Sequence, residues 1–368
     1  MFSLRLKIYA LILLFIILVG VAAGIWFWPK KMPLFTDWHD NAGQIKIAKY
    51  LDLNKIPLPD NLRAYLLSKE GSGLNVIYFD GQKLIAHDSF DGDYFSVLYL
   101  NAMRTLAESP QYTLLPGYYL ISFLDGVHDA YAWPVLGFAG TKQLVANSQV
   151  VLLPDPDVMQ GYRQNFTAID NNLENYAWDK KIAKVFWRGA ANGIKHDSTD
   201  INGSPRLKFL NKTANFKFVD VGLTGYAFLI NDQFMQKLQD TFPLKEAMAP
   251  EESIRYKYLI DIDGKSCSWS RMAWILYSNS VLLKHQSDKI QWYYDRLKPY
   301  VHYIPIAEDF SDLARQYDWL ESHQTEAMAI ATNGREIAKD IFSDEGVMRA
   351  LEQSLLAYNS VINNKLEY

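Results

Sequence analysis

The sequence predicts an α/β protein with two domains, each built on a sheet of parallel strands, that face each other across a cleft. Short segments rich in branched and aromatic residues alternate along the chain with longer helical segments, which is typical of parallel sheets covered by helices. The 368 residues allow two domains of ordinary size, and a hydrophobic content of 49% is ample for buried cores.

Composition excludes several classes of protein. The formal net charge of -4 and the absence of long basic runs argue against a nucleic-acid-binding surface. The single cysteine, Cys267, excludes a disulfide framework within the chain and any metal site made of several cysteines. It also favours a reducing compartment over an oxidising one.

The clearest unit lies at residues 255–284, where a strand, a turn, a helix and a second strand are predicted in immediate succession. Residues 256–262 alternate as a half-buried strand does, and Asp263-Gly264 is a turn signal that ends the strand. Residues 280–283 are short and apolar, so they predict the next, more buried strand.

The helix between these two strands is expected to begin at a phosphate-binding position. Ser266 or Ser268 would cap it, and its apolar residues recur with helical spacing. The free amides of its first turn would lie beyond the carboxyl end of the preceding strand, where an anionic phosphate is favoured. Arg271 stands on the first turns and would add a positive charge at the same place.

The remaining elements fall into two groups along the chain. Residues 40–175 predict a first domain with a helix at 94–108 and strands at 75–79, 83–87, 118–124 and 149–153. A second domain begins near residue 184, with further strands at 185–187, 216–221 and 301–306. A final helix at 345–366 is expected to pack across both domains.

Four motifs in the second half of the chain resemble those of glycosyltransferase family 90. They are Trp187-Arg188-Gly189, the strand that runs into Asp263-Gly264, Ser270-Arg271 and the run LKPYVHYIPI at 297–306. The resemblance covers roughly residues 184–341 and is weaker over 40–175. This family includes bacterial lipopolysaccharide-modifying enzymes, fungal capsule-associated proteins and animal protein O-glucosyltransferases.

The resemblance implies a fold and a reaction. The fold is the GT-B arrangement, in which two Rossmann-like domains face a cleft. The reaction is transfer of a sugar from a nucleotide-sugar donor with inversion and without metal. We therefore expect the second domain to hold a UDP-sugar and the first to hold the acceptor, with no further cofactor.

Basic residues near the ends of predicted strands are the candidates for binding the donor diphosphate. Arg188 ends a strand and is followed by Gly189 and other small residues that would let a ligand approach the backbone. Its guanidinium could bind phosphate oxygens in a bidentate manner, and the alternative is a structural pair with a carboxylate. Arg206, at the start of a predicted helix, is a second candidate, and the resemblance assigns Arg271 to the diphosphate.

The segment from Asp261 to Ser268 supplies further candidates and one alternative. The loop residues Asp263, Gly264 and Ser268 are expected to line the donor site, although some animal members of the family carry Arg where Asp263 stands. Asp261 and Asp263 would lie on one face of the strand, and paired carboxylates of this kind bind a divalent metal in another class of glycosyltransferases. We expect no metal, because the family resembled here uses cationic side chains instead.

Asp125 is our candidate for the general base. It follows the predicted strand at 118–124 of the first domain, so it would project into the cleft opposite the donor. The family's catalytic aspartate follows a corresponding strand. His128 and Asp129 are rivals because they are close in sequence, and the alternative for Asp125-Gly126 is a turn without a catalytic role.

Residues 8–28 predict a transmembrane helix near the N-terminus. The segment carries no charge over about 20 residues, which is enough to cross a bilayer. A cleaved secretory signal is the alternative, because small residues occupy 20–24. Trp26 and Trp28, at the expected membrane interface, favour the anchor.

The flanking charges bear on orientation. Lys30, Lys31, Lys46 and Lys49 after the span slightly outnumber Arg5 and Lys7 before it. This excess favours a cytoplasmic catalytic domain, and a lumenal enzyme of the secretory pathway is the alternative.

These observations give one organisation and one function. We expect an anchor at 1–31, an acceptor-side domain at 32–178, a nucleotide-sugar-binding domain at 179–344 and a C-terminal helix at 345–368. The function is that of a single-pass membrane glycosyltransferase that moves a hexose or pentose, glucose or xylose foremost, to a hydroxyl of a glycan, lipopolysaccharide core or protein. The alternative is a non-catalytic, membrane-tethered nucleotide- or glycan-binding protein of the same fold.

We predict that deleting residues 1–31 yields a soluble, folded protein, because the apolar surface that needs lipid is confined to residues 8–28. Gel filtration and circular dichroism of the truncated chain would check this. Aggregation of the truncated chain, together with release of the full-length chain from membranes by carbonate, would show that the anchor assignment is wrong.

Overall fold

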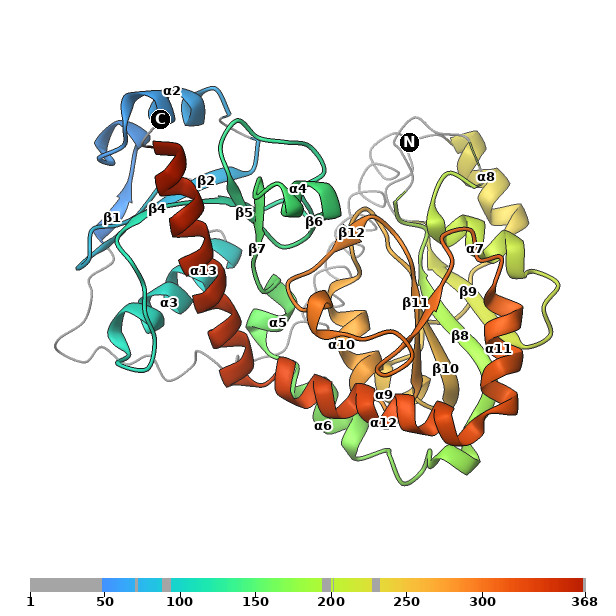
Figure 1. The fold of residues 1–368 in the computed structure, drawn as a ribbon. Coiled ribbons are helices and arrows are strands. Elements are labelled where there is room, and N and C mark those ends of the chain that lie inside the picture. The colour runs from blue at the N-terminus through green and yellow to red at the C-terminus, as the bar shows by residue number, and fades with distance from the viewer. Residues whose placement is uncertain are drawn as a thin grey trace, which may run out of the picture. The chain divides into compact units, whose positions relative to one another are not determined.

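The computed structural model describes residues 48–69, 72–87, 94–193, 200, 202–226 and 232–366. These residues belong to one compact unit, which spans residues 40–368 and contains two large sheets (Figure 1). The predicted membrane span at 8–28 lies outside them. None of the described helices is both long enough and apolar enough to cross a membrane.

The first sheet has six strands in the order β1-β3-β2-β4-β5-β7. Their bounds are Ala48–Leu51 for β1, Leu74–Phe79 for β2, Leu84–His87 for β3, Gly117–Ser122 for β4, Val135–Gly137 for β5 and Val150–Leu152 for β7. The helices in this half of the chain are α2 (Asp60–Leu67), α3 (Tyr94–Glu108), α4 (Lys142–Ala146), α5 (Pro156–Gln160) and α6 (Arg163–Asp170).

The first sheet is mixed, which differs in part from the expected parallel arrangement. β1 pairs with β3, β4 with β5 and β5 with β7 in parallel, whereas β2 runs antiparallel to both β3 and β4. The reason is local: a tight turn joins β2 to β3, and a turn this short can only connect antiparallel strands. In it the Asp80 side chain accepts hydrogen bonds from the main-chain N–H groups of Gln82 and Lys83.

The second sheet has five strands, all parallel, in the order β13-β11-β10-β8-β9. Their bounds are Ile182–Ala190 for β8, Val219–Gly225 for β9, Tyr256–Asp261 for β10, Val281–His285 for β11 and Ile304–Ile306 for β13. β13 begins later than the predicted strand at 301–306, because Val301 and His302 form a turn with Lys298.

The helices of the second half are α7 (Pro205–Thr213), α8 (Asp232–Thr241), α9 (Pro250–Ser253), α10 (Trp269–Tyr277), α11 (Leu313–Ser322) and α12 (Gln324–Ile341). Short 3-10 turns occur at η1 (Leu53–Lys55), η3 (Trp178–Lys180) and η4 (Tyr294–Arg296). A two-stranded ladder pairs β6 (Gly140–Thr141) with β12 (Lys289–Ile290) and so joins the two halves of the chain.

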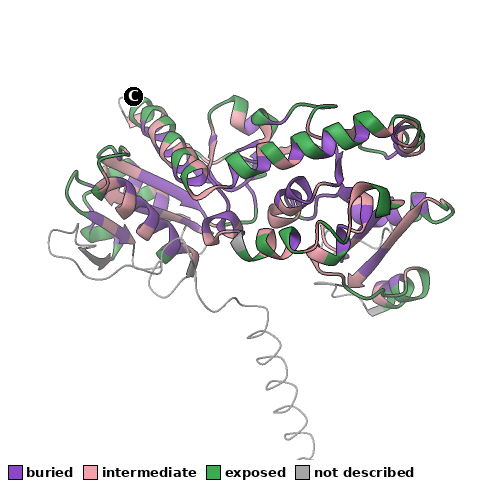
Figure 2. Ribbon diagram, turned by 90° about the horizontal axis from the view of Figure 1, so that it is seen from below, coloured by how far each residue is buried: buried purple, intermediate pink, exposed green. Residues whose placement is uncertain are grey.

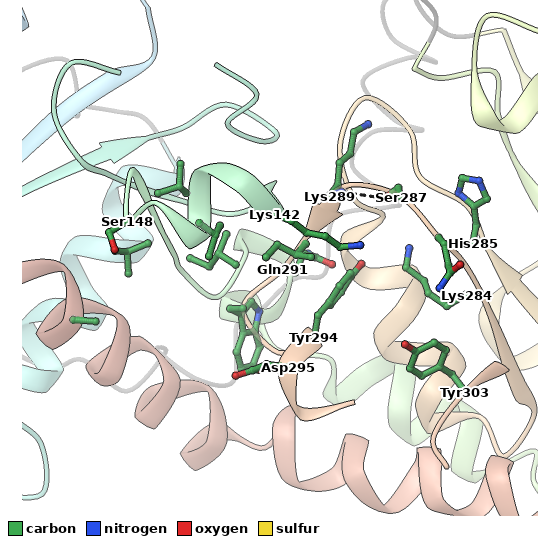
Figure 3. Close-up of a pocket in the computed structure, with 18 of the residues that line it drawn as sticks. Lys142, Ser148, Lys284, His285, Ser287, Lys289, Gln291, Tyr294, Asp295 and Tyr303 are labelled. Carbon is green, nitrogen blue, oxygen red and sulfur yellow. Dashed lines mark hydrogen bonds between the residues drawn. The ribbon is translucent and has the colours of Figure 1, made fainter. Parts of the chain in front are cut away.

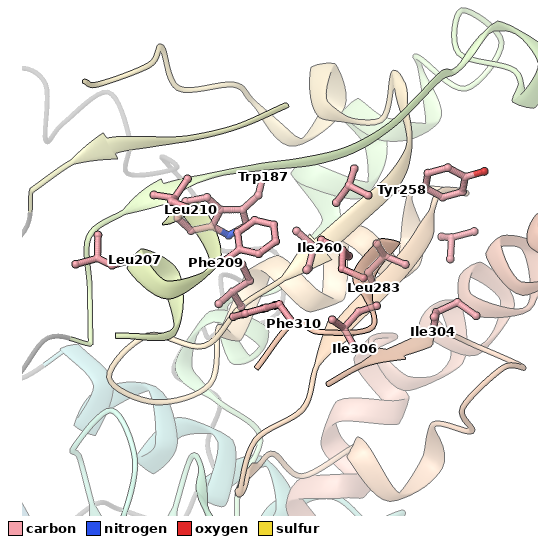
Figure 4. Close-up of a cluster of buried hydrophobic side chains, with 14 of the residues drawn as sticks. Trp187, Leu207, Phe209, Leu210, Tyr258, Ile260, Leu283, Ile304, Ile306 and Phe310 are labelled. Atoms are coloured by element: carbon pink, nitrogen blue, oxygen red, sulfur yellow. The ribbon is translucent and has the colours of Figure 1, made fainter. Parts of the chain in front are cut away.

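The hydrophobic core of the second half forms where α7 meets one face of the parallel sheet (Figure 4). Trp187, Ile260 and Leu283 come from three different strands, and Leu207 and Phe209 pack on them from α7. Residues of α12 join the same core, and α10 packs on α12 and on β10 and β11. Helices on both faces are what the alternating sequence predicts.

The last helix, α13 (Asp344–Leu366), packs on β4, β7 and α3 of the first half and also touches α12. Its buried residues recur three or four positions apart, as a helix with one apolar face requires. Figure 2 shows this alternation of buried and exposed turns along the helices. The Tyr358 hydroxyl donates to the Pro134 carbonyl at 2.9 Å and accepts from the Leu120 N–H at 3.2 Å.

Candidate functional site

The order of the second sheet places its ligand-binding edge between β8 and β10. In chain order the strands run 2-1-3-4-5 across the sheet, so the connections leave β8 and β10 toward opposite sides. In doubly wound sheets a crevice opens at such a switch point, beyond the carboxyl ends of the strands. A ligand-binding site is therefore expected among the residues that follow β8 and β10.

Two glycine loops meet at this edge. Gly193 follows β8 with a φ of 81°, and a Cβ atom at this position would lie 2.7 Å from the carbonyl oxygen of Gly264, which follows β10. Any other residue would force the two loops apart. The glycines therefore let the two loops pack closely at the strand ends, and the space beyond these ends is left to side chains.

Two arginines occupy that space. Arg206 of α7 and Arg271 of α10 lie over the ring of Trp187, at 5.8 and 5.6 Å from its centroid. Arg206 donates to the carbonyl of Ala190 at 3.1 Å and, more weakly, to that of Ile262 at 3.4 Å. Burial, and then repulsion from Arg271, lower the pKa of Arg206 to about 10.

Arg271 is the freer of the two. Neither a hydrogen bond nor an ion pair engages its guanidinium within the described part of the chain, although burial lowers its pKa. A Cβ atom at Gly189 would lie 3.2 Å from a terminal nitrogen of Arg271, so this glycine makes room for the guanidinium. Two adjacent guanidinium groups without a carboxylate partner form a site that an anion would stabilise.

Below the arginines, Lys284 of β11 ties two carboxylates together. Its ammonium lies 2.8 Å from Asp261 and 3.0 Å from Asp263, and all three side chains are buried. Ser268 donates to Asp261, and Ser287 donates to Asp263 at 2.6 Å. Burial alone would raise the pKa of Asp263, but Lys284 and Ser287 hold it below its usual value.

This cluster bears on the metal alternative. Both carboxylates of the proposed pair, Asp261 and Asp263, are already matched by the Lys284 ammonium. Over the described ranges no three His, Cys, Asp or Glu side chains converge as metal ligands would. Asp263 contacts Lys284 and Ser287 and also lines a cavity of about 230 Å³.

Arg188, another predicted donor ligand, already has a carboxylate partner. Its guanidinium lies 2.7 Å from Asp220 of β9 and also donates to the Asp220 carbonyl at 3.0 Å. Asp220 further accepts from the Tyr256 hydroxyl at 2.6 Å. This is the structural pair with a carboxylate that the sequence left open as an alternative. A role of Arg188 in binding a ligand stays a prediction.

Asp125 follows β4 and lies beside the second half of the chain. The side chain of Asp125 is exposed, while Gly126 is buried. A Cβ atom at Gly126 would lie only 2.2 Å from the Ser266 hydroxyl, so the turn at 125–126 packs directly on the loop that leads into α10. The geometry thus places the candidate base next to the loop between β10 and Arg271.

The start of α10 differs from the expected phosphate site. Ser268 occupies the N-cap position but makes no capping hydrogen bond, because its hydroxyl is directed to Asp261. Instead Asp157 of α5 approaches the helix: burial raises its pKa, and hydrogen bonding from the side chain and main chain of Ser270 opposes that rise. The expectation of a serine cap is therefore wrong, and the amide of Ser270 already faces a carboxylate.

Two cavities flank residues 285–289. One of about 230 Å³ lies at the carboxyl ends of the parallel strands and is lined by Asp263, His285 and Ser287 together with Ser204 and Lys208 of the α7 region. Another of about 620 Å³ lies toward β7 and α13 (Figure 3). The arginine pair lines neither cavity, and only the smaller one shares a residue of the predicted donor site.

Sequence reasoning missed Lys284 and Trp187 as site residues. A signal for Lys284 was available, because β10 ends in Asp261 and the adjacent parallel strand reaches Lys284 at the same level. Trp187 belongs to a motif that the sequence singled out, but its role as a surface beneath two guanidinium groups depends on where α7 and α10 begin.

Comparison with known proteins identifies relatives of this chain. The family model described as glycosyl transferase family 90 matches residues 133–367. Protein O-glucosyltransferase 2 of Danio rerio is 28% identical over 213 residues, which cover 56% of this chain and 39% of that protein. Human protein O-glucosyltransferase 3 is 26% identical over 241 residues, or 64% of this chain and 43% of that protein. The matches thus span less than half the length of these relatives.

Solved structures show a more distant likeness. The chain aligns with a glycosyltransferase from Rickettsia africae at 12% identity and a TM-score of 0.38, covering 63% of this chain and 64% of that one. It aligns with Anabaena HepE in complex with UDP-glucose at 10% identity and a TM-score of 0.36, covering 75% and 69%.

The Lys284 cluster generates a prediction about stability. Lys284→Met should lower the free energy of unfolding at neutral pH by about 3 to 5 kcal/mol, because it leaves two buried carboxylates without a cation. Lys257→Met on β10 is the matched control, since Lys257 donates to the neutral Gln324 at 2.6 Å, and should cost about 1 kcal/mol. Urea unfolding measures both.

The pH dependence should also change. In the wild type the depressed pKa of Asp263 contributes stability above about pH 4, and this stability is lost as the pH falls. In the variant a buried carboxylate without its cation would take up a proton more readily, so the deficit relative to the wild type should shrink toward pH 4. An equal deficit at both pH values would contradict the assignment.

Proposed function

The chain belongs to glycosyltransferase family 90, and on this premise we propose that it transfers a sugar from a UDP-sugar donor to an acceptor hydroxyl, with inversion and without metal. The observation that carries the proposal is the convergence of Arg206 and Arg271 over Trp187 at the switch point of the parallel sheet. A diphosphate supplies the charge that these two guanidinium groups lack. The names of the relatives favour glucose as the sugar, and xylose is the second candidate.

The donor would lie across the carboxyl edge of the second sheet. Its diphosphate would meet Arg271 first, because that guanidinium has no competing partner among the described residues. Arg206 is held by backbone carbonyls and would add its charge from the other side. The 230 Å³ cavity, lined by Asp263 and Ser287, would receive another part of the donor.

The reaction needs one proton acceptor and one stabilised leaving group. Asp125 would take the proton from the acceptor hydroxyl as its oxygen attacks the anomeric carbon. The bond from that carbon to the diphosphate oxygen breaks, and UDP leaves with the electron pair. Arg206 and Arg271 would stabilise the negative charge that develops on the leaving diphosphate.

The acceptor and the cellular setting are inferred from the sequence. The acceptor would be a hydroxyl of a glycan, lipopolysaccharide core or protein, bound on the side of Asp125. We propose a GT-B arrangement with a domain boundary near residue 178, supported by the doubly wound second sheet. Attachment to a membrane through residues 8–28, with the catalytic domain on the cytoplasmic side, rests on the uncharged run and its flanking lysines.

A panel of sugar nucleotides tests the function itself. Residues 32–368 would be incubated with each donor, and released nucleotide would be measured with and without a chelator. Release of UDP from one donor, unaffected by the chelator, is the expected result. Binding of UDP without any turnover on any donor would support a non-catalytic binding protein instead.

We predict that Arg271→Ala weakens UDP binding about tenfold or more and changes the melting temperature little, because the guanidinium would meet the ligand and, within the described chain, makes no hydrogen bond or ion pair beyond its contact with the Trp187 ring. Arg188→Ala is the comparison. It should chiefly lower stability, since it leaves Asp220 with a weaker cation, Lys245 at 3.4 Å. Titration calorimetry and thermal unfolding on the same preparations separate the two effects. Unchanged UDP affinity in Arg271→Ala would remove the central support of the proposal.

We predict that Asp125→Asn lowers turnover by a factor on the order of a hundred or more while UDP affinity and melting temperature stay near those of the wild type, because Asn keeps the size but cannot accept the proton. Asp129→Asn, four residues along the same loop, is the matched control and should remain active. Wild-type turnover in Asp125→Asn would instead direct attention to Asp129 or His128.

A further inference from the structure

The 620 Å³ cavity adjoins the proposed donor site and shares His285, Ser287 and Lys289 with the lining of the 230 Å³ cavity. It lies between the β11-to-η4 segment on one side and α4, β7 and α13 on the other (Figure 3). Arg206, Arg271 and Asp125 do not line it, and the paired strands β6 and β12 run between it and the turn at Asp125. Its volume is in the range of ordinary small-molecule sites.

One end of the cavity presents hydrogen-bond donors. Tyr294 and Lys142 line it from opposite sides, and Figure 3 shows their polar ends directed toward each other. The Tyr294 hydroxyl is buried and makes no hydrogen bond to a described residue apart from a weak approach to the Cys267 thiol. A buried hydroxyl without a strong hydrogen-bond partner favours a ligand that can accept a hydrogen bond from it.

The ammonium groups of Lys284 and Lys142 lie near the Tyr294 side chain. Lys284 lies 5.5 Å from the centroid of the Tyr294 ring, and its contacts to Asp261 and Asp263 use two of its three N–H donors. The Lys142 ammonium is exposed at the rim and meets no carboxylate of the described chain. Tyr294 and Lys142 therefore offer donors that no described acceptor engages by a hydrogen bond or ion pair, and Lys284 keeps one N–H donor beyond its two carboxylate contacts, although Asp295 also lines the cavity.

The other end of the cavity is aliphatic. Val145 of α4, Val151 of β7 and the α13 residues Ala357 and Val361 form this wall. These side chains offer a ligand apolar contact and no hydrogen bonds. The cavity thus has one cationic, donor-rich end and one apolar end.

We propose that this cavity binds an anion that carries an apolar chain, a carboxylate or phosphate ester whose head meets Tyr294, Lys142 and Lys284 while its chain lies against α13. Neutral glycans lack the charge that the head group supplies, and inorganic anions lack the chain. The head group is assigned to Tyr294, Lys142 and Lys284 and the diphosphate to Arg206 and Arg271, so the proposal does not rest on the donor site, although the linings of the two cavities share His285, Ser287 and Lys289.

Binding can be measured with simple probes below their micelle concentrations. Decyl phosphate and decanoate are titrated into the full-length chain by calorimetry, and the comparison between them distinguishes a phosphate from a carboxylate head. Decyl maltoside supplies the chain without the charge, and inorganic phosphate supplies the charge without the chain. We expect saturable 1:1 binding of at least one decyl anion, at least tenfold tighter than either control.

Variants locate the site. Lys142→Glu should weaken binding of the decyl anion at least tenfold, whereas Lys237→Glu on α8 should leave it unchanged. Val361→Trp should fill the apolar end and abolish binding, whereas Val97→Trp on the exposed face of α3 should not. Tyr294→Phe should weaken binding several-fold with little change in the melting temperature, because the contact of the hydroxyl within the described chain is the weak one with the Cys267 thiol.

Two results would overturn the proposal. One is equal affinity for decyl maltoside and the decyl anions, which would indicate hydrophobic adsorption only. The other is unchanged binding in both Lys142→Glu and Val361→Trp, which would place the ligand elsewhere. UDP titration of the same variants serves as the fold control and should give wild-type affinity, so failure here does not touch the proposed sugar transfer.

Discussion

The ion pair of Lys284 with Asp261 and Asp263 is the constraint on which the site depends. A buried ammonium is tolerable only because two carboxylates meet it, and the carboxylates are tolerable only because of the ammonium. Together they fix the ends of β10 and β11 at one level, and they direct Ser268 and Ser287 inward. The loop between β10 and α10, which leads to Arg271, is consequently held in place by the contacts of Asp263 with Lys284 and of Ser268 with Asp261.

Above this ion pair the balance of charge is reversed. Arg206 and Arg271 share an aromatic surface, Trp187, and neither forms an ion pair within the described chain, although Asp261 attracts both guanidinium groups at longer range. The same edge of the sheet therefore carries two layers of charge. In the lower layer Lys284 neutralises Asp261 and Asp263, and in the upper layer the two arginines have no ion-pair partner within the described chain. Asp263 belongs to the lower layer and also lines the 230 Å³ cavity, where Lys284 and Ser287 partner its carboxylate.

Contacts between the two halves of the chain position the remaining groups. Gly126 packs on Ser266, the β6–β12 ladder joins the halves, and Asp157 approaches the start of α10. Each of these contacts comes from a loop or a short element that follows a strand of the first sheet. The carboxyl edge of the second sheet and the turn at Asp125 are thus in direct contact.

The sequence by itself determined the pattern of strands and helices, the strand-turn-helix-strand unit at 255–284, the length of α3 and the family, because hydrophobic periodicity, turn residues and motifs are local properties of the chain. It also identified Arg206, Arg271 and Asp125 as candidates. Only the tertiary structure decided that Arg188 is paired with Asp220 while Arg271 is free, that Ser268 serves Asp261 and not the helix, and that Lys284 completes the cluster. The physical reason is that the tertiary fold decides which partner a side chain meets: Arg188 and Lys284 find carboxylates more than 20 residues away, and Ser268 turns to nearby Asp261 only because the carboxyl end of β10 lies beside it.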